Sequence, residues 1–333
     1  PSHFFPMTTT ARPPQMISRR QAVTQAGVLV GAALTAGYQT SVAAESKPNS
    51  PRASGSFIYC LNTATIRGQK LGIVKEIEVT AQAGYQAIEP WVGSIETYQK
   101  EGGSLTDLKR RIADLGLTVE SAIGFPQWIV DDDAKRAQGL ERAKFEMDLI
   151  AQIGGKRLAA PPTGATELPR LDLLKAAERY RSLLEAGDQI GVVPQLELWG
   201  FSKNLNRLGE CACVAIETRH PKACVVADIY HLYKGGSDAS GLRLLSKEAI
   251  PVLHVNDYPA DPPREKIDDS HRVYPGDGIA PVTEILRAVH DQGGQTVLSL
   301  ELFHRKYWEM DALEVARIGL DKVKSAVATA LKR

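Results

Sequence analysis

The sequence predicts a single (β/α)8 barrel, an α/β fold with a closed parallel sheet, and three observations support this prediction. From residue 57 onward, short apolar runs alternate with longer segments of helical period. Eight such pairs follow one another without a change of composition that would indicate a second domain. The competing fold, a doubly wound sheet, usually has a glycine-rich phosphate turn after its first strand, and residues 62–68 lack that pattern.

The predicted strands are short runs of apolar and β-branched residues, which favour extended structure. In chain order they cover residues 57–61, 87–91, 118–124, 157–160, 193–199, 225–229, 252–256 and 297–303. A segment with apolar residues at helical spacing follows each run, as the repeating unit of the barrel requires.

The predicted helices cover about 71–83, 104–115, 134–153, 171–190, 204–219, 241–249, 280–292 and 310–331. Glycine follows four of them closely, where left-handed C-terminal caps are common: Gly84, Gly116, Gly154 and Gly191. Asp311 precedes the last helix and is expected to cap its first turn.

The first 44 residues have the pattern of a secretory signal. Arg19 and Arg20 precede an alanine- and glycine-rich apolar stretch at 26–36, and small residues follow at 41–44. Paired arginines are typical of twin-arginine export signals, so residues 1–44 predict an exported, periplasmic protein. The apolar stretch is too short for a stable membrane anchor. A disordered basic tail is the alternative interpretation.

Composition limits the remaining organisation and the partners. Residues 45–56 are rich in proline and serine and predict a flexible linker, which leaves residues 57–333 for the catalytic barrel. The chain has 40 Lys and Arg against 39 Asp and Glu, and no block of five basic residues. Nucleic acid is therefore not expected as a partner, because such binding needs clustered positive charge. The four cysteines form no C-x-x-C pair, and we expect all four to be small, buried hydrophobic residues.

Four predicted strands in the second half reach a residue that can bind a divalent metal. These residues are Glu197, Asp228, His254 and Glu301. The C-terminal ends of the strands converge on one face of a parallel barrel, so the four side chains are expected to meet there. Such an oxygen-rich cage, with a charge of about −3, suits Mn²⁺ or Mg²⁺, whereas zinc often prefers thiolate-rich sites. The alternatives are structural salt bridges for the glutamates, a helix cap for Asp228 and a core histidine for His254.

The order of these residues resembles the sugar isomerase/epimerase group of xylose isomerase-like barrels. The shared pattern is Glu, Asp-x-x-His, His-x-x-Asp and Glu at four successive strand ends, and residues 272–279 are similar to the loop before the family's seventh helix. Across residues 57–333, the resemblance implies one divalent metal held by Glu197, Asp228, His254 and Glu301. The expected ion is Mn²⁺, with Mg²⁺, Co²⁺ or Zn²⁺ as alternatives. The resemblance also implies that homo-oligomers can form.

The resemblance implies enolising chemistry on a small-molecule sugar substrate. Glu197 and Glu301 match the pair that moves protons, and His231 matches a substrate-contacting histidine. We expect an isomerase or epimerase that removes a proton next to the carbonyl of a free ketose, keto-sugar or related compound through an enediolate. A lyase or dehydratase that eliminates β to a keto group, of inosose or keto-glycoside type, is the alternative. A non-catalytic sugar-binding barrel is a second alternative, and a DNA-repair nuclease is disfavoured by the absence of a basic groove.

Several further residues are expected to line the substrate pocket. Glu89 and Trp91 follow the second predicted strand, and Asp257 follows His254 by three residues. Arg272 lies in a long loop where an arginine could meet a substrate oxygen, although Arg264 is an alternative. For Glu89 and Asp257, a structural role is an equal alternative, and core packing explains Trp91 as well.

Overall fold

A computed structural model describes residues 56–332 of the 333-residue chain. The predicted signal peptide and almost all of the predicted linker lie outside these residues. Eight parallel strands form one sheet in the order β3-β2-β1-β8-β7-β6-β5-β4. Their bounds are β1 Phe57–Asn62, β2 Ala87–Glu89, β3 Thr118–Val119, β4 Arg157–Ala160, β5 Val193–Glu197, β6 Val225–Asp228, β7 Val252–Val255 and β8 Thr296–Leu300.

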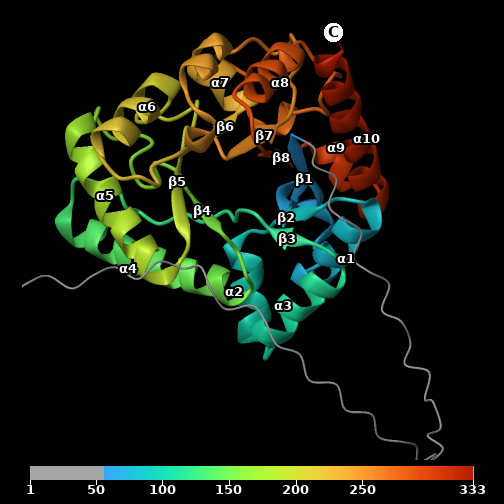
Figure 1. Cartoon of the computed structure of the whole chain (residues 1–333), viewed down its shortest axis with the longest axis horizontal. Helices are drawn as coiled ribbons and strands as arrows, with labels where there is room; N and C mark the ends of the chain where they lie inside the picture. The colour runs from blue at the N-terminus through green and yellow to red at the C-terminus, as the bar shows by residue number, and fades with distance from the viewer. Residues whose placement is uncertain (1–55, 333) are drawn as a thin grey trace, which may run out of the picture. The chain divides into compact units, whose positions relative to one another are not determined.

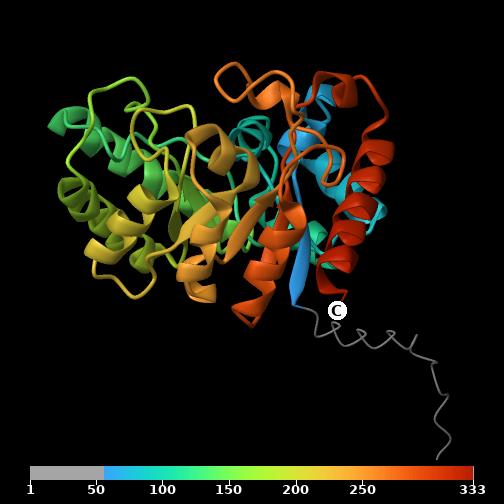
Figure 2. The same ribbon diagram turned by 90° about the horizontal axis from the view of Figure 1, so that it is seen from above.

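Helices surround the strands, as Figure 1 shows. The α-helices are α1 Ile73–Ala83, α2 Val92–Lys100, α3 Leu105–Asp114, α4 Asp133–Gln152, α5 Leu173–Ile190, α6 Leu208–Glu217, α7 Ile229–Gly235, α8 Val282–Asp291, α9 Arg305–Trp308 and α10 Ala312–Leu331. The 3-10 helices are η1 Thr63–Gln69, η2 Ala239–Leu244, η3 Lys247–Ala249 and η4 Asp269–His271. In Figure 2, α10 stands beside β1, so the first and last units of the fold are neighbours.

The sheet closes into a barrel through single bridges beyond β3. The N–H of Ala159 donates to the carbonyl of Ala122 at 2.9 Å, and Ile123 bridges to both Trp91 and Ala159. The predicted strand 118–124 is therefore regular only at its start, with isolated pairing after it. These bridges join β3 to β4, the two ends of the strand order, and confirm the predicted (β/α)8 barrel.

Helix prediction failed where helices are short or where an apolar pattern is exposed. Helices α2, α7 and α9 were not predicted, because each is shorter than the stretch of about 11 residues over which an apolar period can be judged. The predicted helix at 241–249 consists of η2 and η3 instead. Only Leu242 is buried in η2, and Leu244 is 88% exposed, so the apolar spacing there does not report a packed face.

Two apolar clusters fill the fold on the two sides of the sheet. The larger cluster lies between the strands and the surrounding helices. The smaller cluster has one residue from each of five strands: Cys60, Ala87, Val226, Val252 and Val297. Because alternate residues of a strand face opposite sides, these side chains form an apolar layer inside the barrel. Of the four cysteines, three are buried as expected and Cys213 is half-buried.

None of the helices between residues 56 and 332 is long and apolar enough to cross a membrane.

Candidate metal centre

The register of the parallel sheet brings the four predicted ligands to one level. Asp228 on β6 is opposite His254 on β7, and His254 is opposite Ser299 on β8. Glu197 pairs with the residue two positions before Asp228, and Glu301 lies two positions after Ser299. Residues two apart on a strand face the same side. All four side chains therefore point into the barrel, just beyond the apolar layer.

The three carboxylates converge on one nitrogen of the His254 imidazole. Its Nδ1 atom lies 3.2 Å from Oε2 of Glu301, 3.6 Å from Oδ2 of Asp228 and 3.7 Å from Oε1 of Glu197. One ligand atom each from Glu197, His254 and Glu301 lies within 4.8 Å of the others. Each of the four residues is at most 3% exposed. The structure thus brings the four predicted residues together, with three of them in the tightest group.

Asp228 stands slightly apart from that group because other residues hold its oxygens. Its Oδ1 accepts the backbone N–H of His231 at 2.8 Å and so caps α7. Its Oδ2 accepts from Asn256 at 3.1 Å and from Arg272 at 2.9 Å. The helix cap considered from the sequence is therefore present, and it uses one oxygen while the other faces His254.

Glu89 lies against the other nitrogen of the same imidazole. Its Oε2 atom is 3.0 Å from Nε2 of His254 and accepts hydrogen bonds from Ser299 at 2.6 Å and Asn62 at 3.0 Å. Burial acts to raise the pKa of Glu89, but attraction and hydrogen bonding to His254, together with the hydrogen bond from Ser299, outweigh burial, and the pKa is lowered. A carboxylate at the outer nitrogen of a metal-binding histidine fixes the orientation of its ring. Glu89 is therefore placed to orient a ligand.

Asn62 links the two sides of the site and was not predicted from the sequence. Its amide donates to Glu89 at 3.0 Å and to Oε1 of Glu301 at 3.0 Å. Its Oδ1 accepts the indole N–H of Trp91 at 3.2 Å. Position was the only available signal, because Asn62 ends the first strand at the level where Glu89 ends the second.

Arg272 is buried among the same carboxylates and is 1% exposed. Its Nη1 donates to Asp228 and to Glu301, both at 2.9 Å, and its Nη2 lies 3.1 Å from Nε2 of His231. The guanidinium also stacks over Tyr230, 4.5 Å from the ring centroid. The structure thus places Arg272 beside the metal-ligand candidates. Arg264, the alternative, is half exposed and pairs with a surface glutamate.

The neighbouring carboxylates of the centre differ in the direction of their pKa shifts. Burial raises the pKa of Glu197 to about 8, helped by Glu301 and Asp228 and opposed by His254. Burial also acts to raise the pKa of Asp228, but the positive charge of Arg272 outweighs it, and the pKa is lowered. Burial disfavours protonation of His254, yet its glutamate neighbours outweigh burial and raise its pKa well above the ordinary value. The cluster therefore attracts positive charge strongly.

The residues present fit a divalent cation. Oε2 of Glu197 and Nδ1 of His254 are buried and have no hydrogen-bond partner among residues 56–332. Buried polar atoms are rarely left without a partner, and each such atom calls for an explanation. Carboxylate oxygens with one imidazole nitrogen are a donor set that divalent ions accept. A cation between these groups would satisfy both orphaned atoms.

His231 is buried beside the cluster, and its backbone N–H donates to Asp228 as described. Its Nδ1 accepts the backbone N–H of Gly200 at 3.3 Å, and its ring lies 5.7 Å from that of Phe201. Burial lowers its pKa, while Asp228 opposes the shift. Burial thus favours the neutral form of the His231 imidazole, which lies next to the centre, where a substrate oxygen could meet it.

Asp257 lies in the loop after β7 and is used there by the backbone. Its carboxylate accepts N–H groups of Tyr258, Gly276, Gly278 and Ala280 at 2.8 to 3.1 Å. These bonds fix the loop that carries Arg272. The loop-forming alternative is therefore present, and contact of Asp257 with a substrate stays a prediction.

Aromatic rings stand near the centre in a continuous row. Trp91 lies 5.1 Å from Phe125, Phe125 lies 6.0 Å from Trp199, and Trp199 lies 5.2 Å from Phe201. Phe125 is 38% exposed and Phe201 44% exposed. Apolar ring faces pack well against the C–H faces of sugars. Trp91 is thus half-buried between this row and the polar cluster.

Comparison with known proteins gives a consistent family. Residues 77–326 match the family model described as the xylose isomerase-like TIM barrel. Inosose isomerase of Halalkalibacterium halodurans is 24% identical over 278 residues, covering 81% of this chain and 96% of that protein. Fructoselysine 3-epimerase of Escherichia coli O157:H7 is 23% identical over 252 residues, covering 70% and 86%. The 3-dehydroshikimate dehydratase of Pseudomonas aeruginosa is 26% identical over 243 residues, covering 69% of this chain but 36% of that protein.

A solved structure agrees with the fold. The crystal structure of the IolI protein with a bound zinc atom superposes with a TM-score of 0.76 at 21% identity, covering 83% of this chain and all of that chain. The family model covers most of the barrel, and the relatives are sugar isomerases, epimerases and a dehydratase. The chain belongs to the xylose isomerase-like TIM barrel family.

Proposed function

We propose that this protein is a divalent-metal-dependent isomerase or epimerase of a free ketose, keto-sugar or related polyhydroxy carbonyl compound. The convergence of three buried carboxylates on Nδ1 of His254 carries the proposal. The names of the isomerase and epimerase relatives support the same class of reaction. Mn²⁺ is the favoured ion because the donors are mainly oxygen, with Mg²⁺, Co²⁺ or Zn²⁺ as alternatives.

Each residue of the centre has a proposed role. Glu197, Asp228, His254 and Glu301 would hold the ion. A bound divalent cation supplies Lewis-acid stabilisation of negative charge on the carbonyl and hydroxyl oxygens of a substrate. Glu197 and Glu301 would transfer protons: one removes the proton next to the carbonyl and leaves an enediolate, and the other returns a proton. Return on the opposite face inverts the carbon, and return on the neighbouring carbon isomerises the sugar.

The surrounding residues have supporting roles in this proposal. The buried imidazole of His231 and the guanidinium of Arg272 would contact substrate oxygens, because both lie beside the carboxylates without blocking Nδ1 of His254. Glu89 would position His254, and Trp91 would bound the pocket through its half-buried ring.

Deuterium exchange tests the proposal directly. The protein is loaded with Mn²⁺ and mixed in D₂O with a panel of ketoses and keto-glycosides, and the sugars are followed by NMR. We expect deuterium at a carbon next to the carbonyl, together with an inverted or isomerised product, and loss of both after chelation of the metal. A metal-loaded protein that binds a sugar without any exchange would instead be a sugar-binding barrel.

A lyase is the second candidate, because the matching segment of the Pseudomonas aeruginosa protein belongs to a dehydratase. The same base would remove the proton, but the electrons would then expel a group β to the keto carbon, so an acid must protonate the leaving oxygen. The unsaturated carbonyl product absorbs ultraviolet light, which a simple epimer does not. Appearance of that absorbance in the same panel would decide for elimination.

We also propose that residues 1–44 direct export to the periplasm. The support is the sequence pattern of Arg19 and Arg20 before an apolar stretch and a small-residue end. Expression in a bacterium with and without a functional twin-arginine pathway, followed by periplasmic fractionation, tests this. We expect a shortened protein in the periplasm only when the pathway is functional, and full-length protein in the cytoplasm of both strains would exclude it.

A further inference from the structure

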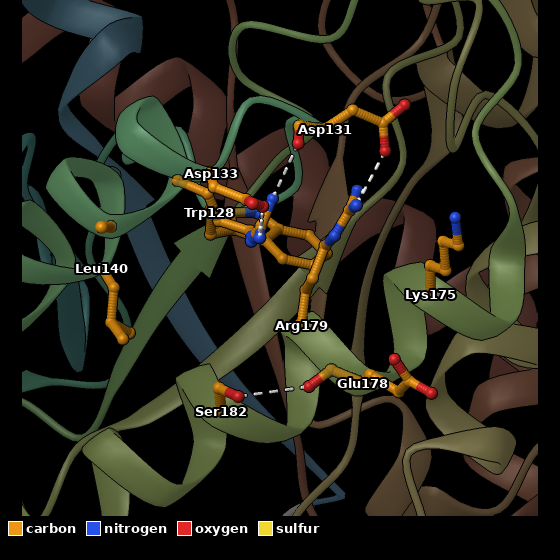
Figure 3. Close-up of a pocket in the computed structure, with 10 residues that line it drawn as sticks. Trp128, Asp131, Asp133, Leu140, Lys175, Glu178, Arg179 and Ser182 are labelled. Carbon is orange, nitrogen blue, oxygen red and sulfur yellow. Dashed lines mark hydrogen bonds and ion pairs between the residues drawn. The ribbon is translucent and has the colours of Figure 1, made fainter.

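Among the concave regions outside the metal centre, two differ clearly in how their charged side chains are used. The first, of about 610 Å³, lies between α4 and α5 and is shown in Figure 3. Its arginines are bound within the protein: Arg179 pairs with Asp131 at 2.7 Å, and Arg136 pairs with Asp133 and donates to the carbonyl of Val130 at 2.9 Å. Because these arginines bind groups of a loop, few of their N–H groups remain to bind a ligand.

The second region lies at the C-terminal end of β1 and β2. A cavity of about 180 Å³ is lined by Thr63, Arg67, Glu76, Trp91, Gly93 and Ser94. It is continuous in its lining with a cavity of about 470 Å³ that shares Arg67, Glu76, Gly93 and Ser94. Together they reach the size range of small-molecule sites, roughly 300–1,000 Å³. We call them the β1–β2 pocket.

Glu76 gives this pocket an unsatisfied polar group. It is 6% exposed, and its Oε2 is buried without a hydrogen-bond partner among residues 56–332. Within the described part of the chain it also has no ion pair, although Arg67 lines the same pocket. Burial raises its pKa to about 7. A carboxylate left in this state inside a pocket indicates a partner that arrives with a ligand.

Arg67 gives the pocket a donor that is equally available. Its guanidinium stacks over Trp91, 4.3 Å from the ring centroid, and the described part of the chain offers it neither a carboxylate nor a carbonyl acceptor. Stacking fixes the plane of the guanidinium and leaves its N–H groups at the edge free to donate. Stacking therefore positions Arg67, and no carboxylate of the described residues pairs with its charge.

The charge balance of the β1–β2 pocket selects a neutral polyhydroxylated ligand. The lining has two basic residues, Arg67 and Lys70, and two acidic ones, Glu76 and Glu101, so neither an anion nor a cation is favoured. A hydroxyl group donates and accepts, so neighbouring hydroxyls can satisfy Glu76 and Arg67 at once. The hydroxyl side chains of Thr63 and Ser94 add further partners.

The pocket lies near the metal centre, with Trp91 and Asn62 between them. Trp91, which lines the pocket, donates to Asn62 at 3.2 Å, and Asn62 donates to Glu301 at 3.0 Å. We propose that the β1–β2 pocket is a subsite for a second sugar ring, so that the substrate is a disaccharide or sugar glycoside whose keto unit lies at the metal centre. This inference rests on the proposed function, because it assumes that a keto-sugar binds there.

Binding measurements on the metal-loaded full chain test the subsite. The probes are fructose and three disaccharides that link glucose to different hydroxyls of fructose: turanose, maltulose and isomaltulose. We expect at least one disaccharide to bind about tenfold more tightly than fructose by calorimetry. Arg67→Ala and Glu76→Leu should each bring that ratio to within about twofold of one. Equal affinity of the wild-type protein for fructose and all three disaccharides would overturn the subsite.

Matched controls separate a lost subsite from a damaged fold. Arg110→Ala and Glu141→Leu remove exposed charges outside the pocket, on α3 and α4, and should leave the affinity ratio unchanged. Glu76→Leu removes a carboxylate that has no partner, so its melting temperature should not fall below that of wild type. A ratio that survives both pocket variants would assign the preference elsewhere and refute the proposal.

The subsite and the proposed reaction can fail separately. Tight disaccharide binding that depends on Arg67 and Glu76, without deuterium exchange in any sugar, would keep the subsite and remove the enzymatic function. Deuterium exchange into fructose with no preference for any disaccharide would keep the enzymatic function and remove the subsite.

Discussion

Two layers inside the barrel come from the same strands, yet they have opposite chemistry. The apolar layer contains Cys60, Ala87, Val226, Val252 and Val297. Two positions further along each strand lie Asn62, Glu89, Asp228, His254 and Ser299, all fully buried and all polar. Because a strand repeats every two residues, both layers point inward and differ only in height. On each strand, an inward-facing residue that packs the barrel is therefore followed two positions later by one that belongs to the polar layer.

The comparison also explains why a fully polar layer is tolerated in the interior. Buried carboxylates are costly unless they are paired and hydrogen-bonded. Glu89 meets Ser299, Asn62 and His254, and Asp228 meets Arg272. Glu76 lies outside this layer and has none of these partners. These pairs stabilise the polar layer, and among residues 56–332 the orphaned atoms of Glu197 and His254 remain for a cation.

The largest expected effect is the loss of reaction when a carboxylate that faces His254 of the polar layer is neutralised. Glu197→Gln keeps the shape of the side chain but removes a proton-transfer group and a metal ligand. We expect deuterium exchange to fall by about a thousandfold, since general acid–base groups contribute roughly 10²–10⁴. NMR exchange rates at saturating metal measure this. Glu141→Gln on the surface of α4 is the control. A Glu197→Gln protein with the exchange rate of wild type would contradict the role proposed for Glu197 in the reaction.

Glu76→Gln should sharpen the contrast between a partnered and an unpartnered buried carboxylate. The folded pKa of Glu76 is raised to about 7, so this group favours the folded state below pH 4.5 and loses that advantage as pH rises to about 7. Relative to wild type, the variant should gain up to about 3 kcal/mol of unfolding free energy at pH 8 and almost nothing at pH 4. Urea unfolding at both pH values measures this. An equal gain at both would show that charge burial is not the cause.

Glu89→Gln tests whether the polar layer positions its own ligand. The amide can keep a contact with Ser299 but cannot hold the imidazole as a carboxylate does. We expect metal affinity to fall by about 10- to 100-fold, the usual range for such partners. Competition with a coloured chelator measures the affinity. Unchanged affinity in a folded variant would assign Glu89 a purely structural role.

The smallest expected effect comes from the apolar layer. Val297→Ala removes two buried methyl-sized groups and should cost about 1.5 kcal/mol of unfolding free energy. Metal affinity should stay within about twofold of wild type, because Val297 lies one layer below the ligands. Urea unfolding and the same chelator assay measure both quantities. A large loss of metal affinity would mean that the two layers are not independent.

Much of this organisation could be predicted from the sequence. The eight units follow from the alternation of apolar runs and helical segments, and Glu197, Asp228, His254 and Glu301 were found because each lies at or just beyond the end of such a run. Convergence of strand ends in a parallel barrel then places them together. Strand three was overestimated, because its backbone pairing is broken into single bridges after Val119.

The partners of those residues could not be predicted, because they depend on register between distant strands. Asn62 and Glu301 are separated by 239 residues along the chain but are joined by a hydrogen bond. Nothing in the local sequence of Asn62 indicates this contact. The same is true of Glu76, which occupies an ordinary position in the first turn of a helix, and whose missing partner is visible only in three dimensions.

The most direct test is a crystal structure of the protein grown with Mn²⁺, with anomalous scattering recorded above the manganese absorption edge. We expect one strong anomalous peak inside the barrel, in contact with Glu197, Asp228, His254 and Glu301. A peak elsewhere, or none among these four side chains at saturating metal, would contradict the central claim.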